Sequence, residues 1–310
     1  MPERSSGTAP TSSTPAYHGA MQTILVTGGG RGLGRETARK LAAAGHRVVL
    51  VARTPAAAGA AASAIRARHP GVEVATHAAD LSSLAAVRAL AAAVLAAHER
   101  LDAVLHVAGV MQQSPTRRLT VDGIEETLAV NALAPYLLSG LLLPALERSP
   151  SARIVNVSSR RHLPDSHGEP VNFDLDDPQL SRGYHPDRAY KNSKLAVIWL
   201  THEEARRLPA TVTANAVCPG FVPMTASDSA RGLKRAFMRS VLPRMSFAVS
   251  VDAATDSFAF MATDPSLEGV SGRFFGEMHE IESSPDSHDV AKGARFWALA
   301  AELTGFAWPG

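Results

Sequence analysis

Residues 23–53 read TILVTGGGRGLGRETARKLAAAGHRVVLVAR, and this stretch decides the fold. It begins with a short apolar run at residues 23–27, passes through a cluster of glycines, and then shows helical spacing as far as Gly45. The run VVLVA within residues 47–52 is apolar on both faces, which is typical of a parallel strand covered by helices. The order strand, glycine turn, helix, strand therefore predicts a βαβ unit.

The rest of the chain continues this alternation without an internal repeat or a second composition regime. We therefore predict one doubly wound α/β domain of the Rossmann type with about seven parallel strands, whose ligands bind beyond the carboxyl ends of the strands. Further helices are expected at residues 56–69, 82–98, 121–146, 187–208 and 251–262, and further strands at residues 72–79, 101–108, 153–157, 212–217 and 272–275.

Composition limits the class of protein. The 310 residues are 45% hydrophobic and 19% charged, with a formal net charge of +2, and the basic residues are scattered, so we expect neither nucleic acid nor an anionic membrane as a partner. Residues 1–20 look like a flexible tail before one domain at residues 21–310. Cys218 is the single cysteine, and no run of about 18 apolar residues lacks charges or helix breakers, so we expect a cytoplasmic protein without an integral membrane segment.

The glycine cluster has the composition of a phosphate-binding turn. Glycine permits the tight turn and the close approach of backbone N–H groups to a pyrophosphate, at the N-terminus of the next helix. The spacing TGxxxGxG resembles the cofactor loop of the short-chain dehydrogenase/reductase family. The cofactor-binding residues predicted in this loop are Gly28, Gly30, Arg31, Gly32, Leu33 and Gly34.

The end of the second strand favours NADP(H) over NAD(H). No Asp or Glu stands there to accept a hydrogen bond from the ribose 2′-hydroxyl, whereas Arg53 and Arg31 offer guanidinium groups that suit a 2′-phosphate. The alternative is two solvated surface arginines. After the third strand, Asp80 and Leu81 resemble the adenine-contacting pair of the family, although Asp80 is also a candidate for the capping turn of the next helix.

Tyr190 and Lys194 form the centre of the expected chemistry. Their i, i+4 spacing places them on one face of a helix, where the ammonium is expected to lower the pKa of the phenol from its usual value near 10. Resemblance to the family gives Tyr190 the proton transfer and Lys194 the nicotinamide ribose. It also selects Ser159 to polarise the substrate carbonyl and Asn131 to hold a water in a proton relay.

The family's NNAG segment is only half present. Ala108 and Gly109 match its end and are predicted to contact the cofactor, but His106 and Val107 stand where the family has asparagines. We expect this departure to lose hydrogen bonds that steady the central sheet.

The segment Cys218-Pro219-Gly220 resembles the turn that passes the nicotinamide, and Val222 is predicted to bond the carboxamide through its backbone. Position 224, where the family usually has Thr or Ser, is Met224, and Thr225 follows one place late, so a phosphate contact from Thr225 is not expected. Cys218 is expected to be a small buried apolar residue.

Thirty-one positions separate Ser159 from Tyr190. This insertion, at about residues 160–187, and the segment around SKLA resemble the retinol dehydrogenase and WW-domain oxidoreductase branch of the family. Histidines 162, 167 and 185 in the insertion do not have the spacing of a tight ligand set, so we predict no metal site. The family builds its substrate lid at about residues 223–247, where apolar residues would suit a hydrophobic substrate; an ordinary amphipathic helix is the alternative.

These features predict an NADPH-dependent carbonyl reductase or alcohol dehydrogenase acting on a small hydrophobic ketone, aldehyde or secondary alcohol. One alternative is a dehydratase or epimerase that works by transient oxidation, although its usual TGxxGxxG spacing is absent. Another is an NADP(H)-sensing binding protein with a silent site. The resemblance also implies a homodimer or homotetramer that pairs through the helices around Asn131 and Tyr190.

Overall fold

The computed structural model describes residues 20–223 and 248–309. Apart from Ala20 and Pro223, the expected tail at residues 1–20 and the expected lid at residues 223–247 lie outside these residues. The prediction that the lid lines an apolar pocket therefore stays a prediction.

One sheet crosses the whole domain, in the order β3-β2-β1-β4-β5-β6-β7-β8. All neighbouring pairs are parallel except β7 and β8, so the expected parallel sheet of about seven strands is confirmed and gains one short antiparallel edge strand. The strands are β1 (Thr23–Val26), β2 (Arg47–Ala52), β3 (Val74–Ala78), β4 (Ala103–His106), β5 (Ala152–Val157), β6 (Val212–Cys218), β7 (Phe274–Gly276) and β8 (His279–Glu280).

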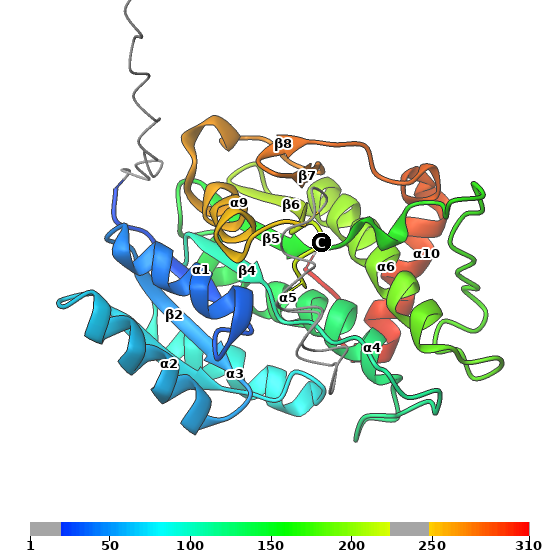
Figure 1. Cartoon of the computed structure of the whole chain (residues 1–310), viewed down its shortest axis with the longest axis horizontal. Coiled ribbons are helices and arrows are strands. Elements are labelled where there is room, and N and C mark those ends of the chain that lie inside the picture. Colours follow the sequence, from blue (N-terminus) through cyan, green and yellow to red (C-terminus); the bar gives the residue numbers. More distant parts are fainter. Residues whose placement is uncertain (1–19, 224–247, 310) are drawn as a thin grey trace, which may run out of the picture.

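Helices cover both faces of the sheet (Figure 1). One apolar cluster joins the sheet to α1, α2 and α9, and a second joins its other face to α3 and α5. The helices are α1 (Gly32–Ala43), α2 (Pro55–Arg68), α3 (Leu84–Ala97), α4 (Glu126–Leu128), α5 (Ala134–Leu146), α6 (Pro186–Arg207), α9 (Val251–Thr263) and α10 (Val290–Thr304). Short 3-10 turns are η2 (Arg160–His162), η5 (Pro265–Leu267) and η6 (Pro285–His288).

The helix expected at residues 121–146 begins later and is irregular. It starts at Glu126 and widens into the π-helical segment η1 (Ala129–Leu133) before α5. Pro135 explains the irregularity, because it has no N–H to donate to the carbonyl of Asn131 and its ring crowds that carbonyl. The position of Pro135 within the expected helix is thus a local signal for this irregularity.

The continuous helix Glu126–Leu146 is also the one helix among the described residues that is long and apolar enough, by composition, to cross a bilayer. Of its apolar window, 89% is buried inside the structure. We therefore assign this helix to the core of the domain.

Helix α3 begins two residues later than expected. The Ser83 hydroxyl accepts a hydrogen bond from the N–H of Ala86 at 3.3 Å and caps the helix, which starts at Leu84. Asp80 belongs to the turn just before, where its carboxylate accepts hydrogen bonds from the backbone N–H and the hydroxyl of Ser82 at 3.0 and 2.8 Å. Asp80 therefore has the turn-forming role considered above as an alternative.

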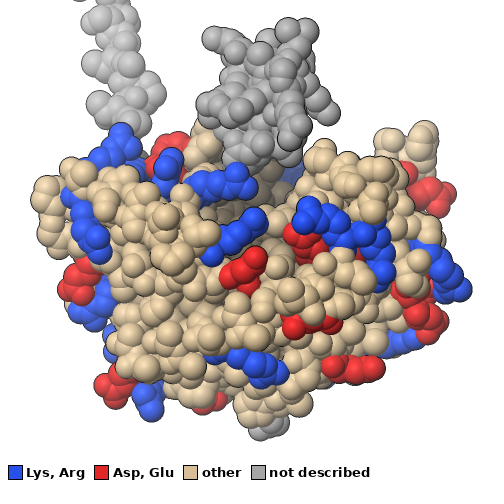
Figure 2. Space-filling view, turned by 90° about the horizontal axis from the view of Figure 1, so that it is seen from below, with Lys and Arg blue, Asp and Glu red and all other residues tan. Residues whose placement is uncertain are grey.

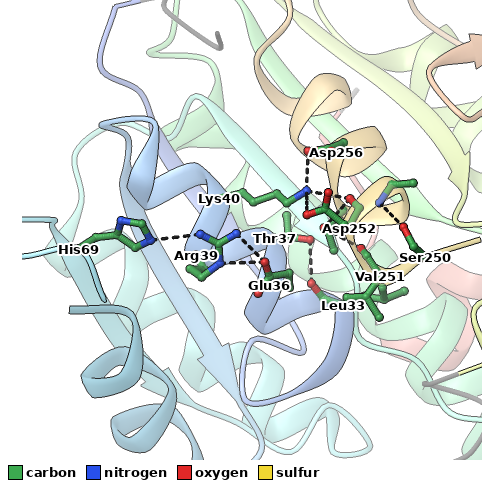
Figure 3. A network of polar contacts seen from close by, with 12 residues as sticks. Leu33, Glu36, Thr37, Arg39, Lys40, His69, Ser250, Val251, Asp252 and Asp256 are labelled. Carbon is green, nitrogen blue, oxygen red and sulfur yellow. Dashed lines mark hydrogen bonds and ion pairs between the residues drawn. The ribbon is translucent and has the colours of Figure 1, made fainter. Parts of the chain in front are cut away.

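An ion-pair network fastens α1 to α9 (Figure 3). The ammonium of Lys40, which is 9% exposed, contacts the carboxylates of Asp256 and Asp252 at 2.5 and 2.8 Å and donates to the Asp252 carbonyl at 2.8 Å. Ser250 caps α9 by accepting from the N–H of Ala253 at 3.0 Å. The helix that follows the glycine turn is thus tied to the first turn of α9.

The C-terminal part of the chain covers α5 and α6. Trp297 of α10 meets the ring of Tyr136 edge-on at 4.8 Å between ring centroids. Beyond α10, the carbonyl of Phe306 accepts a hydrogen bond from the Tyr136 hydroxyl, and Trp308 Nε1 donates to the Tyr136 carbonyl at 3.2 Å. Pairing of two copies through this face stays a prediction, and it would require α10 or the residues after it to move.

Charged side chains of both signs lie on the face drawn in Figure 2. Lys and Arg gather beside a hollow in the upper middle of that face, and Asp and Glu lie among and around them. The positive charge on this face is therefore local and does not form a continuous belt.

The packing of Phe306 and Trp308 against α5 can be tested by a substitution at Gly140. A Cβ atom there would lie 2.4 Å from the Phe306 ring and 2.7 Å from Trp308 Nε1, closer than any side chain tolerates without movement. We expect Gly140→Ala to lower the free energy of unfolding by about 1–3 kcal/mol, although alanine is the better helix former. Urea unfolding measures the change. The control is Gly59→Ala in α2, where no atom lies within 4 Å and a gain of about 0.5–1 kcal/mol is expected. Equal gains for both variants would contradict the packing described here.

Candidate active site

The glycine turn between β1 and α1 requires glycine for two reasons, which are its backbone angles and one close backbone contact. Gly28 and Gly32 have positive φ angles of 71° and 55°, which favour glycine. At Gly34 a Cβ atom would lie 2.4 Å from the carbonyl oxygen of Gly28. The turn therefore brings the N-terminus of α1 to the carboxyl end of β1, and the first turn of α1 contains no acidic residue. Such a helix start is suited to receive a phosphate.

The turn is fastened to the end of β4. The Thr27 hydroxyl donates to the carbonyl of Leu105 at 3.3 Å and accepts from the N–H of Ala108 at 3.1 Å. A Cβ atom on Gly28 would lie 3.0 Å from the backbone of Ala108, and one on Gly109 would lie 3.4 Å from Asn131 Oδ1 and 3.8 Å from Lys194 Nζ. The predicted residues Ala108 and Gly109 thus connect the glycine turn to the expected catalytic residues.

The residues predicted to meet the adenosine end lie at the ends of β2 and β3. Arg53 is exposed directly after β2. Burial raises the pKa of Asp80, but the Ser82 hydrogen bonds and the charge of Arg53 outweigh it and keep that pKa below its ordinary value. Leu81 packs on the α3 and α5 side of the core. Arg53 and Asp80 are therefore close enough to interact beside the glycine turn.

Asn131 lies in the π-helical segment and is 2% exposed. Its Oδ1 accepts from the N–H of Val110 at 2.8 Å, and its Nδ2 donates to the Val110 carbonyl and to the Ser193 hydroxyl at 2.9 Å each. The side-chain amide of Asn131 therefore holds the segment after β4 against α6. Its backbone carbonyl cannot receive a hydrogen bond from Pro135.

Ser159, Tyr190 and Lys194 come together where β5 and α6 meet. The Ser159 side chain lies in hydrogen-bonding reach of the Tyr190 hydroxyl and favours the phenolate. Lys194 Nζ lies 5.6 Å from the centroid of the Tyr190 ring and donates to the carbonyl of Val157 at 2.9 Å. Ser158 has a structural place instead, because its hydroxyl donates to the Lys194 carbonyl at 2.9 Å. The assignment of Ser159 to the substrate carbonyl stays a prediction.

Burial dominates the electrostatics of this pair. It raises the pKa of Tyr190 above its ordinary value, and the hydrogen bond from Ser159 offsets only part of that rise. It also lowers the pKa of Lys194 from 10.5 to about 8. The expectation that Lys194 lowers the pKa of Tyr190 is therefore not met here, because the ammonium faces the Val157 carbonyl and the low-dielectric surroundings disfavour both charges.

The turn after β6 lies beside the same pair. Cys218 lies close to both Tyr190 and Lys194, a proximity that was not foreseen from the sequence. Cys218 is 4% exposed, as expected, and its sulfur accepts from the N–H of Gly220 at 3.3 Å. After Pro219, Gly220 has a φ of +72°, and a Cβ atom there would meet Val249 at 2.4 Å. Val222 is buried.

The central strands carry polar side chains that hold α5 and α6 to the sheet. His106 Nε2 lies 2.7 Å from the Ser139 hydroxyl in α5, and burial lowers the pKa of His106 to about 3, so the ring is neutral. In β5 next to it, Asn156 Nδ2 donates to Thr201 and to Glu204, and burial raises the pKa of Glu204 to about 8. The expected loss of hydrogen bonds at the HVAG segment is thus offset at His106 by its hydrogen bond with Ser139, while the apolar side chain of Val107 can form none.

The insertion at residues 160–187 packs mainly on α6. Phe173 and Trp199 lie 5.4 Å apart between ring centroids. His162 is fully buried under Ser159, with Nδ1 2.5 Å from the Ser159 carbonyl, whereas His167 and His185 are exposed. These histidines do not converge on one point. The burial of His162 went unforeseen because a single histidine in a loop gives no periodic signal.

This chain is similar to known proteins in both sequence and structure. The sequence model described as "short chain dehydrogenase" matches residues 22–168. Human retinol dehydrogenase 14 is 35% identical over 92% of this chain and 86% of its own length, and human polyprenol dehydrogenase is 31% identical over 92% and 85%. The solved Pseudomonas aeruginosa RhlG/NADP active-site complex is 25% identical, with a TM-score of 0.66 over 85% of this chain and 97% of that chain.

The buried ammonium of Lys194 predicts a pH dependence of stability. Its pKa is about 8 in the folded protein and near 10.5 in the unfolded chain, so the unfolded chain binds more protons between these values. The contribution of Lys194 to stability therefore rises as pH increases from about 8 toward 10. In urea unfolding of the cofactor-free protein, Lys194→Met should be more stable than wild type by about 1–3 kcal/mol at neutral pH. That gap should shrink by about 2 kcal/mol toward pH 10. A gap that stays constant over this range would contradict the assignment.

Proposed function

The chain belongs to the short-chain dehydrogenase/reductase family, in its retinol dehydrogenase-like branch, and from this premise we propose that it is an NADPH-dependent carbonyl reductase with a hydrophobic substrate. Members of this family are oxidoreductases of alcohol and carbonyl groups that use nicotinamide dinucleotides. The observation that carries the proposal is the half-buried phenol of Tyr190, which lies close to Ser159 and Lys194 at the edge of the sheet that carries the glycine turn.

We propose that the enzyme works in the direction of reduction, because Tyr190 is protonated and can donate a proton. Its raised pKa keeps the phenol protonated at neutral pH, ready to donate its proton to the carbonyl oxygen of a substrate. Ser159 faces the same hydroxyl and is proposed to bind and polarise that oxygen. When bound, the nicotinamide supplies the hydride to the carbonyl carbon.

Lys194 is proposed to act through its buried ammonium. Its Nζ is anchored to the Val157 carbonyl and lies on the ring side of Tyr190, where it is suited to donate to the nicotinamide ribose hydroxyls. Asn131 would hold the relay water through its backbone carbonyl, since its side-chain amide is engaged by Val110 and Ser193.

Two features support NADP(H) over NAD(H). Arg53 stands exposed at the end of β2, with no acidic residue in the position that would bind a ribose 2′-hydroxyl. Among related structures, two complexes are described as containing NADP. Arg31 at the start of α1 is a second candidate for the 2′-phosphate. The remaining residues proposed to hold the cofactor are Gly28, Gly30, Gly32, Leu33, Gly34, Asp80, Leu81, Ala108, Gly109, Pro219, Gly220 and Val222.

The substrate class is proposed from the relatives and from one sequence feature. Retinol and polyprenols, which name two related dehydrogenases, are long apolar alcohols. Residues 223–247 of this chain are rich in apolar side chains at the place expected for a substrate lid. We therefore propose an apolar aldehyde or ketone as the substrate. The single buried thiol of Cys218 supports a reducing compartment, for which we propose the cytoplasm.

Replacing the phenol tests the proton donor. Tyr190→Phe should lower kcat for reduction of an apolar aldehyde by about 10²–10⁴-fold, because general acid catalysis is lost, while the Kd for NADPH stays close to that of wild type. The matched control is Tyr184→Phe, which removes a buried hydroxyl at the entry to the same helix and should leave kcat nearly unchanged. Wild-type turnover by Tyr190→Phe would overturn the assignment of Tyr190.

Reversing the charge at position 53 tests the choice of cofactor. Arg53→Asp should weaken NADPH binding by about 10–100-fold, because it replaces a charge-assisted contact with repulsion, and should affect NADH far less. Arg68→Asp at the end of α2 makes the same change of charge away from the site and serves as the control. Titration of both cofactors by fluorescence gives the Kd values. Equal weakening of NADPH and NADH would remove Arg53 from the 2′-phosphate site.

A further inference from the structure

His162 is fully buried, in contrast to His167 and His185 of the same insertion, which are exposed. It belongs to η2, the short turn that directly follows Ser159. Its ring meets the ring of Phe274 in β7 edge-on, with 5.0 Å between the ring centroids. Because this histidine has no exposed surface, any effect that it has on the site must pass through the residues it contacts.

The Nδ1 atom of His162 contacts the backbone of Ser159. It lies 2.5 Å from the Ser159 carbonyl oxygen, and the backbone N–H of His162 donates to the same oxygen at 3.3 Å. A carbonyl oxygen only accepts hydrogen bonds, so the ring proton of His162 is on Nδ1. Burial lowers the pKa of His162, which keeps the ring neutral. Two donors of one residue therefore hold the carbonyl of Ser159.

The opposite ring nitrogen of His162 gains nothing from the fold. Nε2 is buried and, among the described residues, has no hydrogen-bond partner. An apolar side chain of similar size would occupy this place without leaving a polar atom unpaired. The contact that a histidine makes here and an apolar residue does not is the hydrogen bond from Nδ1 to Ser159.

Ser159 lies just beyond the end of β5, where the backbone leaves the sheet. Ser158 before it is still fixed to the neighbouring strand, since its N–H donates to the Val217 carbonyl at 2.8 Å. The Ser159 hydroxyl accepts from the N–H of Arg161 at 3.3 Å and lies in reach of the Tyr190 hydroxyl. The direction of this hydroxyl depends on the orientation of the Ser159 peptide, and therefore on what holds its carbonyl.

We propose that His162 is a positioning residue for Ser159. By holding the Ser159 carbonyl from the core, the imidazole fixes the peptide plane and, with it, the direction of the Ser159 hydroxyl toward Tyr190 and the substrate oxygen. This inference rests on the proposed function, in which Ser159 polarises the substrate carbonyl. A displacement of about 1 Å at such a group can slow catalysis about 10²-fold, so one buried hydrogen bond is sufficient to matter.

The contact between Ser159 and Tyr190 can be measured without a substrate. In protein labelled with ¹³C at the tyrosine Cζ atoms, the NMR signal of Tyr190 is identified by its loss in Tyr190→Phe. Ser159→Ala should shift this signal, because a hydrogen-bonding partner of the phenol is removed. His162→Leu and His162→Met, which remove the donor at similar volume, should shift it in the same direction. His162→Asn keeps an N–H donor near the position of Nδ1 and should leave the signal at its wild-type place.

Turnover of decanal with NADPH gives the second readout. His162→Leu should lower kcat about tenfold with the Kd for NADPH close to that of wild type, and His162→Asn should restore most of the loss. In a Ser159→Ala background, His162→Leu should cost less than about threefold more, because both changes act through one hydroxyl. The matched control is His202→Leu, which removes an Nδ1 contact of 3.0 Å to the Ser287 carbonyl and should leave kcat unchanged.

The two readouts separate the possible failures. A wild-type Tyr190 signal in both His162→Leu and His162→Met, or in Ser159→Ala, would overturn the positioning role of His162. A full tenfold further loss of kcat in the Ser159→Ala background would overturn it too, because His162 would then act independently of Ser159. Wild-type turnover by Ser159→Ala would contradict the proposed function of Ser159, and the NMR comparison would still decide whether His162 holds Ser159 against Tyr190.

Discussion

The close contact between Gly34 and the carbonyl of Gly28 is the constraint on which the site depends. Any Cβ atom at position 34 would lie 2.4 Å from that oxygen, so the helix can start this near the strand only with glycine. The same turn brings Gly28 against Ala108 and, through Ala108 and Gly109, reaches Asn131 and Lys194. A single backbone contact thus sets the spacing between the helix end proposed to bind phosphate and the residues proposed for catalysis.

The second constraint on the site is the burial of α6, which controls the pKa values of Tyr190 and Lys194. Burial opposes both charges of the pair, raising the pKa of Tyr190 and lowering that of Lys194. The site therefore holds a protonated phenol beside an ammonium whose pKa is lowered. Such an arrangement stabilises charge mainly while the proton is transferred. The ammonium is kept in place by the Val157 carbonyl, and the helix is kept in place by α10 and by the insertion.

Much of the fold was predictable because its signals are local. Apolar runs such as VVLVA and the glycine spacing at residues 28–34 depend on neighbouring residues alone, and they placed the strands, the turn and Tyr190 with Lys194 correctly. Two features escaped because they depend on the folded surroundings. The hydrogen bond of His106 to Ser139 and the burial that raises the pKa of Tyr190 arise from contacts distant in sequence. The π-helical segment does have a local signal, Pro135, which the helical pattern of residues 121–146 obscured. The edge strand β8, with two residues, is too short to give a periodic pattern.

The parallel bridge between Phe221 and Ala248 has a consequence for the evolution of such chains. The N–H of Val249 donates to the Phe221 carbonyl at 2.8 Å, and Lys40 secures the start of α9 a few residues later. The two anchor points therefore belong to the rigid domain, whatever joins them. Since doubling the length of a closed loop costs only about 0.6 kcal/mol, segments of different length are interchangeable there at little expense in stability. A single scaffold can in this way accept an exchanged segment between Phe221 and Ala248 while its glycine turn stays unchanged.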